Sequence, residues 1–134
     1  MIVTANGPGK HQGGGELVVD AGAGNVVRVF ARSASNQFEH AVLLVGVHHA
    51  RGDKVLDRFE LVTQDRPGIA AASATSALPA RLVPQQFVFC ECGVVGEGTE
   101  TIGLVFAIYD RDDRGQPRLV GLYQWEPRLT VHRR

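Results

Sequence analysis

The chain has 134 residues, of which 44% are hydrophobic and 21% are charged, and this balance predicts one globular domain spanning residues 1–134. Fourteen basic and fourteen acidic residues cancel, which excludes the strongly basic surface on which nucleic-acid binding depends. A chain without net charge also packs against its own copies more readily than a highly charged one.

The sequence predicts neither export nor membrane insertion. The first residues, MIVTANGPGK, lack the basic and apolar regions of a signal peptide, and the longest apolar run, AVLLVGV at 41–47, is too short for a transmembrane helix. Cys90 and Cys92 lie two residues apart, so a strand would point both thiols to one face, where a bridge between them would strain the backbone. We therefore expect reduced thiols and a cytoplasmic protein.

Apolar residues alternate with polar ones along much of the chain, and no segment shows a long helical period. Strand patterns occur at residues 2–4, 16–20, 26–33, 38–49, 54–63, 86–95, 100–110 and 118–125. The segment at 38–49 is apolar on both faces in its middle, which is typical of a central strand. Pro127 cannot donate to a ladder, so the last strand is expected to be bulged or to lie at an edge there. These segments predict an all-β fold, an antiparallel β-sandwich of about 7–8 strands.

Residues 64–86, QDRPGIAAASATSALPARLVPQQ, contain three prolines, many small residues and no clear period. We interpret this stretch as one long irregular loop, of the kind that is usually functional or mobile in a compact domain. If successive strands reverse direction, alternate connections meet at one end of the sandwich. One end would gather the loops near 34–37, 64–86 and 110–117, and the other the glycine-rich loops near 21–25, 50–53 and 96–99. A site built from loops is expected at the first end.

That end carries oxygen-bearing side chains suited to a cation or a sugar. The candidate ligand-binding residues are Asn36, Gln37, Asp65, Asp112 and Asp113, and the candidate metal ligands are Asp110, Asp112 and Asp113. The segment DRDDRG at 110–115 lacks the spacing and the terminal glutamate of the helix–loop–helix calcium motif. Two interpretations stay open: a solvated turn in which Gly115 supplies a positive φ, and a calcium or sugar site completed by neighbouring loops.

The remaining reactive residues form no recognisable catalytic set. His48 and His49 point to opposite faces of a strand, and no His-x-His or Glu-x-x-His pattern indicates zinc. The serines at 33–35 and 73–76 lack a nucleophile-elbow pattern. We therefore predict that the protein is not an enzyme. Two aromatic residues fit either a core position or a sugar-stacking surface, namely Tyr123 and Trp125.

The C-terminal segment FAIYDRDDRGQPRLVGLYQWEPRLTV resembles the ending of the PixA/AidA family of bacterial inclusion-body proteins. The family pattern of an F-A-L-Y strand, a glycine-containing turn and a closing aromatic strand corresponds here to Phe106, Ala107, Tyr109, Gly115, Gly121, Tyr123, Trp125, Pro127 and Val131. The blocks GGGELVVDAGAGNVVRVFARSASNQFEHAVLLVGV and FVFCECGVVGEGTETIGLVFAIY are similar to the family's N-terminal half and penultimate hairpin. The resemblance covers nearly the whole chain, with its blocks in the right order.

The resemblance implies a β-sandwich that accumulates in cytoplasmic inclusions, with expression linked to quorum sensing or phase variation and with no catalytic activity. Some members look like calcium-dependent carbohydrate-binding proteins, so we expect a self-associating homo-oligomer that binds a glycan, with calcium as a candidate cofactor. The alternative is a structural or storage protein whose function is its own ordered assembly.

Two departures from the family pattern bear on these expectations. The family's extra N-terminal strand is absent before Met1, which predicts an open sheet edge or a partner chain that completes it. In addition, Gln37, Phe38 and Glu39 replace a region that usually contains aspartate, which argues against a metal ligand there.

Overall fold

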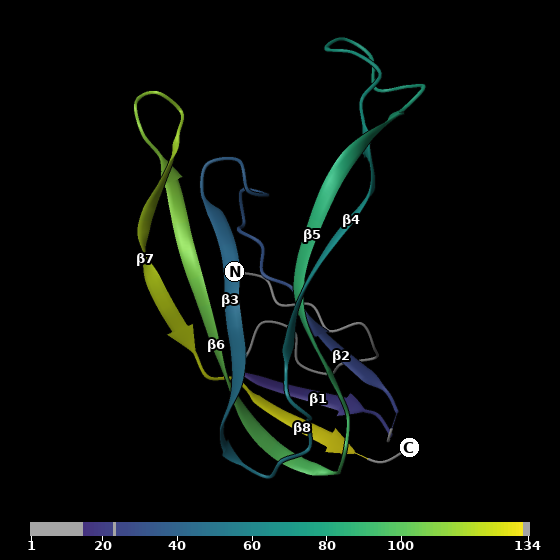
Figure 1. The fold of residues 1–134 in the computed structure, drawn as a ribbon, viewed down its shortest axis with the longest axis vertical. Helices are drawn as coiled ribbons and strands as arrows, with labels where there is room; N and C mark the ends of the chain where they lie inside the picture. Colours follow the sequence, from purple (N-terminus) through teal and green to yellow (C-terminus); the bar gives the residue numbers. More distant parts are fainter. Residues whose placement is uncertain (1–14, 23, 133–134) are drawn as a thin grey trace.

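The computed structural model describes residues 15–22 and 24–132, which form eight strands in two sheets (Figure 1). The strands are β1 (Glu16–Asp20), β2 (Val26–Val29), β3 (Ala41–Gly52), β4 (Glu60–Ala70), β5 (Arg81–Gly93), β6 (Gly98–Arg111), β7 (Pro117–Trp125) and β8 (Arg128–His132). The described residues contain no helix, and the predicted all-β sandwich is confirmed. It follows that none of them forms a helix able to cross a membrane. The strand predicted at 2–4 lies outside the described residues.

Strand β6 organises the larger sheet, whose order is β1-β8-β6-β3, with β7 also paired to β6. β3 follows one edge of β6, while β8 and β7 share the other edge, β8 beside residues 98–101 and β7 beside residues 104–111. The smaller sheet has the order β2-β5-β4. All pairings are antiparallel except that of β1 with β8, which is parallel. The sandwich is therefore mainly, but not wholly, antiparallel as predicted.

Strand β3 lies at an edge of the larger sheet, so the prediction of a central strand at 38–49 is wrong. Alternation explains the error. Val42 and Leu44 face the smaller sheet and are 8% and 4% exposed, whereas Leu43 points the other way and is 44% exposed. We call the side of β3, β6 and β7 that faces away from the smaller sheet the outer face; Leu43, Leu119 and Leu122 lie on it. The apolar run thus reflects an uncovered face and not burial on both sides.

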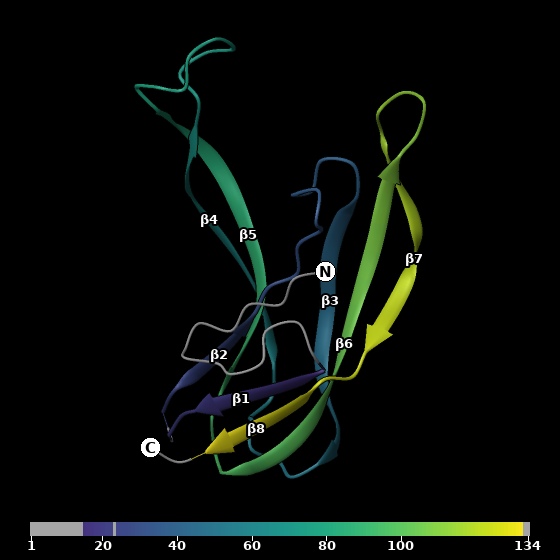
Figure 2. The same cartoon turned by 180° about the vertical axis from the view of Figure 1, so that it is seen from behind.

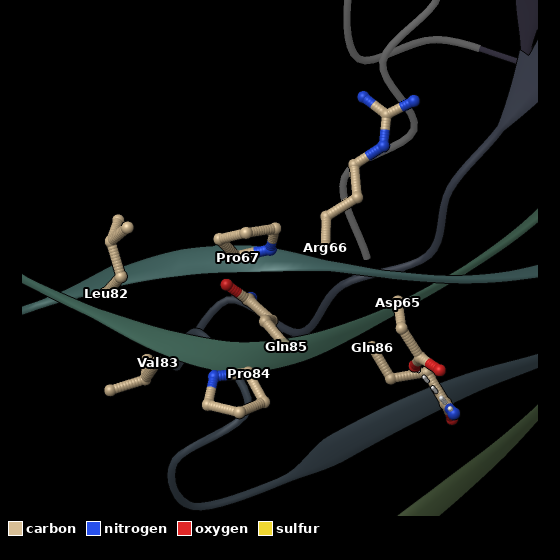
Figure 3. A pocket seen from close by; sticks show the side chains of 8 residues that line it. All are labelled: Asp65, Arg66, Pro67, Leu82, Val83, Pro84, Gln85 and Gln86. Atoms are coloured by element: carbon tan, nitrogen blue, oxygen red, sulfur yellow. Dashed lines mark hydrogen bonds between the residues drawn. The ribbon is translucent and has the colours of Figure 1, made fainter.

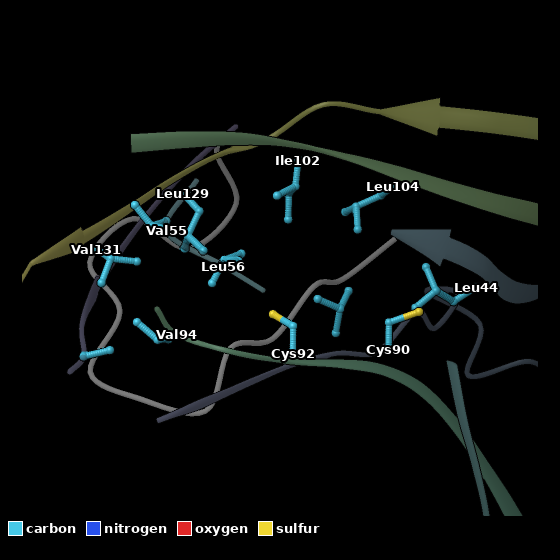
Figure 4. Packing of buried hydrophobic residues seen from close by; sticks show 12 residues of the cluster. Leu44, Val55, Leu56, Cys90, Cys92, Val94, Ile102, Leu104, Leu129 and Val131 are labelled. Atoms are coloured by element: carbon cyan, nitrogen blue, oxygen red, sulfur yellow. The ribbon is translucent and has the colours of Figure 1, made fainter. Parts of the chain in front are cut away.

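The two sheets pack together at one end of the molecule, which we call the closed end (Figures 1 and 4). Leu104 of β6 and Val131 of β8 contribute from the larger sheet, Cys90 of β5 from the smaller one, and Val55 from the segment before β4; each is at most 1% exposed. Burying an aliphatic side chain of this size stabilises the fold by about 1.5–3 kcal/mol. The closed end therefore holds most of the folding energy.

At the opposite end, the open end, the sheets diverge (Figures 1 and 2). β2 pairs with β5 only over Cys90–Gly93, so beyond this point β4 and β5 continue as a two-stranded ribbon. We call residues 63–88 of this ribbon, including its tip, the arm. β3, β6 and β7 form the other branch of the open end. An isolated two-stranded hairpin is marginally stable in water, so the arm depends on additional packing.

The arm corrects the prediction of one long irregular loop at 64–86. β4 and β5 stay paired as far as Ala70 and Arg81, which leaves only residues 71–80 as the connection. Prolines do not interrupt this ladder because Pro67 lies directly opposite Pro84. Opposed residues in an antiparallel pair alternate between positions that exchange hydrogen bonds and positions whose N–H groups point away. A proline pair at a position of the second kind removes no ladder bond.

A buried carboxylate connects three segments at the closed end. Glu100 of β6 is 2% exposed, and its Oε2 accepts hydrogen bonds from the backbone N–H groups of Val55 and Leu56, both at 2.9 Å. Its Oε1 lies 2.8 Å from Nδ1 of His49 on β3. Buried backbone donors need such partners, because leaving one unpaired costs about 1–3 kcal/mol. Glu100 therefore fixes the segment that leads into β4.

Both cysteines are free and buried in the core, as the sequence predicts. Burial raises the pKa of Cys90, against a smaller opposing effect of a backbone hydrogen bond at Val47. The pKa of Cys92 rises from 9.0 to about 12, mainly because of burial and next because of the nearby Glu100 carboxylate. Both thiols are therefore protonated and poorly nucleophilic in the folded protein at neutral pH.

These thiols predict a loss of stability in alkali. Above pH 9 the unfolded chain loses thiol protons that the folded chain keeps until about pH 12, so stability falls over this range. The expected slope for Cys92 is at most about 1.4 kcal/mol per pH unit. Urea unfolding at pH 8, 9.5 and 10.5 measures it, and Cys92→Ala is expected to flatten the profile. Equal slopes for both proteins would contradict the assignment.

Candidate ligand site at the open end

The structure places the expected loops at the same end of the molecule. The loop before β3, the β6–β7 tip and the β4–β5 tip all lie at the open end (Figures 1 and 2). The prediction from strand reversal is therefore confirmed for the end at which these loops gather. The β4–β5 tip, however, lies on the arm, apart from the other two. A site at this end can be built from the loop before β3 and the β6–β7 hairpin.

The β6–β7 tip is held by the side chain of Asp112. Its Oδ1 accepts hydrogen bonds from the backbone N–H groups of Arg114 and Gln116, both at 2.9 Å. Gly115 has a φ of 74°, a conformation that glycine adopts without strain, as the turn interpretation predicts. Asp113 is exposed at the tip. One oxygen of Asp112 thus has a structural role in the turn.

Asp110 is bound by an arginine across the hairpin. Its two carboxylate oxygens accept hydrogen bonds from Nε and Nη2 of Arg118 at 2.9 and 2.8 Å. This paired geometry lowers the pKa of Asp110, mainly through the hydrogen bonds from Arg118. The same pairing raises the pKa of Arg118. A cation could bind Asp110 only by competing with this guanidinium.

The loop before β3 contains an unusual backbone. Asn36 and Gln37 both have positive φ values, 55° and 67°, which is uncommon for residues other than glycine and often occurs at functional sites. The Gln37 side chain acts as a short extension of the sheet: its Nε2 donates to the carbonyl of Val42 at 3.0 Å, and its Oε1 accepts from the N–H of Val42 at 3.1 Å. Gln37 therefore covers part of the free edge of β3 and fixes the shape of the loop.

A shallow cleft of about 280 Å³ lies between this loop and the hairpin. Its polar lining includes Gln37, Glu39, Asp110 and Arg111, and Tyr109 contributes an aromatic ring. The Nε of Arg111 also donates to the carbonyl of Phe38 at 3.1 Å, which ties the hairpin to the loop. The cleft combines the ring of Tyr109, the carboxylate of Glu39 and the guanidinium of Arg111. Groups of these kinds hold sugars or peptides.

Sequence reasoning identified only part of this cleft. Gln37 and Asp110 were expected at the site, whereas Glu39, Tyr109 and Arg111 were not. The missed residues are the chain neighbours of predicted ones. Tyr109 aligns with Ala41 of β3 in the ladder, and this register brings β6 beside the loop that carries Glu39. Pairing the two strands from their sequence patterns would have indicated the neighbourhood.

Other predicted residues do not join the cleft. Asp65 lies within β4, opposite Gln86 on the arm, because the 64–86 stretch is a hairpin and not a loop. Asp110 lines the cleft, but it does not converge with Asp112 and Asp113 on one metal position. Among residues 15–22 and 24–132, no three His, Cys, Asp or Glu side chains are placed to hold one metal ion. The hairpin separates the aspartates because one pairs across the strands and another closes the turn.

Comparisons with known proteins agree with the fold. The family model described as PixA, inclusion body protein, matches residues 1–131. A crystal structure of a PixA inclusion body protein from Burkholderia cenocepacia J2315 superposes with a TM-score of 0.73 at 25% sequence identity, covering 97% of this chain and 70% of that chain. No curated protein matches the sequence. Because the family model spans nearly its whole length, this chain belongs to the PixA family of inclusion body proteins.

Proposed function

We propose that this protein functions by self-association into ordered inclusions in the cytoplasm. The amount of uncovered apolar surface supports the proposal. Among the described residues, thirteen large hydrophobic side chains are exposed, against fifteen buried hydrophobic residues. Large exposed apolar patches on soluble proteins mark interaction sites, and several of these side chains gather on the arm and on the outer face.

The distribution of this surface suits assembly. Exposed apolar residues lie on the arm, such as Leu82 at 73%, and on the outer face, such as Leu122 at 65%. The two surfaces belong to different sheets and share no residues, so contacts through both would link each copy to more than one neighbour. The zero net charge leaves no long-range repulsion to oppose such packing. The family description, inclusion body protein, agrees with this role and names no enzymatic activity.

Sedimentation velocity over micromolar to millimolar protein concentrations tests the proposal. Association is expected to increase with concentration and to persist at high salt, because apolar contacts are not screened. It is also expected to survive Asp112→Ala and Asp113→Ala, which alter only the acidic tip. A single monomeric species across the whole range would overturn the proposal.

Glycan binding at the cleft is a second candidate function. The cleft itself favours it, since Tyr109 offers a ring for the C–H face of a sugar, while Glu39 and Arg111 offer an acceptor and a donor for hydroxyl groups. Repeated copies in an inclusion would add avidity to a weak site. Calcium at this end would have to compete with the hydrogen bonds that oxygens of Asp110 and Asp112 already accept.

Glycan arrays with and without a chelator test this second function. Arg111→Ala is expected to reduce sugar binding at least about ten-fold, because it removes a charged donor from the cleft. Arg114→Ala is the matched control, since Arg114 lies on the tip and does not line the cleft. Equal loss in both variants would contradict a site in the cleft, and unchanged binding in chelator would exclude calcium.

A further inference from the structure

Strand β7 has one edge that no described strand covers. It pairs with β6 along its other edge and with no further strand in the part of the chain that the structure describes. Four of its large side chains are also 45–65% exposed, namely Leu119, Val120, Leu122 and Tyr123. The unpaired N–H and C=O groups of such an edge form a template on which another strand can pair.

The register of the larger sheet shows which groups point to this free edge. On β3, both the N–H and the C=O of Val42 bond to the side chain of Gln37 and so point away from β6. Residues opposite each other in an antiparallel pair either both point inward or both point outward. Ile108, opposite Val42, therefore directs its groups toward β7, and Ala107 directs its own toward β3. Leu122 lies opposite Ala107, so its N–H and C=O point to the free edge of β7.

The regular part of this edge is Gly121–Trp125. It follows a β-bulge, because Val120 has no partner of its own on β6. Within the segment, Gln124 repeats the orientation of Leu122 two residues later, so these two residues carry the groups that a further strand would bind. The segment GLYQW contains neither a proline nor a charged residue, two features that commonly protect an edge from pairing.

The other edges of the two sheets carry features that hinder strand pairing. On the arm, Pro67 of β4 lies opposite Pro84 of β5 (Figure 3), and each lacks the N–H group that a further strand would need. On β3, the side chain of Gln37 occupies the edge at Val42. The remaining edge strands, β1 and β2, have only five and four residues. Among the described strand edges, Gly121–Trp125 is therefore the one most open to a further strand.

We propose that Gly121–Trp125 pairs with the same segment of a second copy of this chain, antiparallel and about a two-fold axis at Tyr123. This inference rests on the proposed self-association and identifies the strand through which two copies join. Full overlap of the segment with its own copy places Leu122 of each chain opposite Gln124 of the other. Both residues point outward, so each of these pairs can exchange two hydrogen bonds.

Several observations favour a copy of the same chain as the partner strand. An antiparallel edge is complementary to itself under a two-fold rotation, which uses the same residues on both copies. The segment is uncharged, so it meets no like charge on its copy. The axis brings two Tyr123 side chains together, and each ring already stacks on Phe106 with a centroid distance of 5.9 Å. In the proposed inclusions, copies of this chain are also the neighbours present at the highest concentration, which drives association by mass action.

Two substitutions at one position separate backbone pairing from apolar contact. Leu122→Pro removes the outward N–H group but no bond to β6, whereas Leu122→Ala shortens the side chain and keeps the N–H. In sedimentation velocity, Leu122→Pro is expected to weaken association at least about ten-fold, because each copy loses one hydrogen bond to the other. Leu122→Ala is expected to keep most of the association. Thermal melting of dilute protein shows whether each variant is folded, and a folded Leu122→Pro chain that associates like the wild type would overturn the inference.

Disulfide trapping locates the axis without introducing a proline. Tyr123→Cys places a thiol on the axis, at a position where opposed side chains are closest. Leu119→Cys is the matched control, since Leu119 is 52% exposed against 45% for Tyr123 but lies before the bulge and away from the axis. The native thiols of Cys90 and Cys92 are buried and do not compete.

Under mild oxidation, Tyr123→Cys is expected to form covalent dimers at least about ten-fold faster than Leu119→Cys, because pairing raises the effective concentration of the two thiols. Equal rates in the two variants would overturn the inference and leave self-association standing through another surface. A wild-type chain that stays monomeric at all concentrations would overturn the proposed function itself.

Discussion

Replacing Glu100 by alanine is expected to lower the free energy of unfolding by about 3–5 kcal/mol. The substitution leaves the buried N–H groups of Val55 and Leu56 without acceptors and opens a cavity beside His49. Each unpaired donor costs about 1–3 kcal/mol. A domain of this size has about 5–15 kcal/mol of stability in total, so the variant would be close to unfolding. Urea unfolding followed by far-UV circular dichroism measures the change.

Two further substitutions separate the hydrogen-bond network from a general effect of removing a carboxylate. Glu100→Gln keeps one oxygen in place to accept both backbone bonds, and its amide can donate to Nδ1 of His49, so a loss of about 1 kcal/mol is expected. Glu126→Ala removes a half-exposed carboxylate that pairs with Arg51 at 3.3 Å, and is expected to cost less than about 1 kcal/mol. If Glu100→Ala costs as little as Glu126→Ala, the network does not hold the segment at 55–56.

The sequence predicts on which face of its strand Glu100 lies, but it does not predict which groups Glu100 binds. In ETIGLV, Glu100 shares the parity of Ile102 and Leu104, so alternation along β6 places it on the core face. Its partners come from β3 and from the segment before β4, and such contacts between distant segments do not follow from local pattern. The sequence signal was therefore a charged residue at a position that strand alternation assigns to the core. The contacts with distant segments explain why a carboxylate is there.

The fold class and the end at which the loops gather were predictable because both depend on strand patterns and reversal. The arm was not predictable in this way, because its prolines and small residues are typical of a loop. Their pairing, Pro67 with Pro84, becomes visible only once the register of β4 and β5 is known. β8 was also missed, since Pro127 was expected to disturb the last strand. β7 is an edge strand, as expected near Pro127, but it ends at Trp125 and a new strand begins at Arg128.

The candidate site was likewise predictable only in part. Hairpin closure around the tip could have paired Asp110 with Arg118, which lie opposite each other in the ladder. That pairing would have argued against three free aspartates at the tip. The positive φ values of Asn36 and Gln37, in contrast, depend on the side chain of Gln37 bonding to Val42, and no sequence pattern indicates this contact.

The division between a closed and an open end predicts a second large effect. Leu104→Ala is expected to lower the free energy of unfolding by about 3–4 kcal/mol, because Leu104 is 1% exposed at the centre of the core and the cavity left behind cannot collapse fully. Urea unfolding of dilute protein, monitored by far-UV circular dichroism, measures the change.

Leu122→Ala removes the same atoms from the outer face of the same sheet, where the side chain is 65% exposed. It is expected to change monomer stability by less than about 0.5 kcal/mol. If both leucines cost the same in the monomer, the outer face is covered within a single chain, and the apolar surface there is not available to other copies. If only Leu104→Ala is costly, the apolar residues of the open end do not stabilise the monomer, and association between chains is the physical reason left for keeping them exposed.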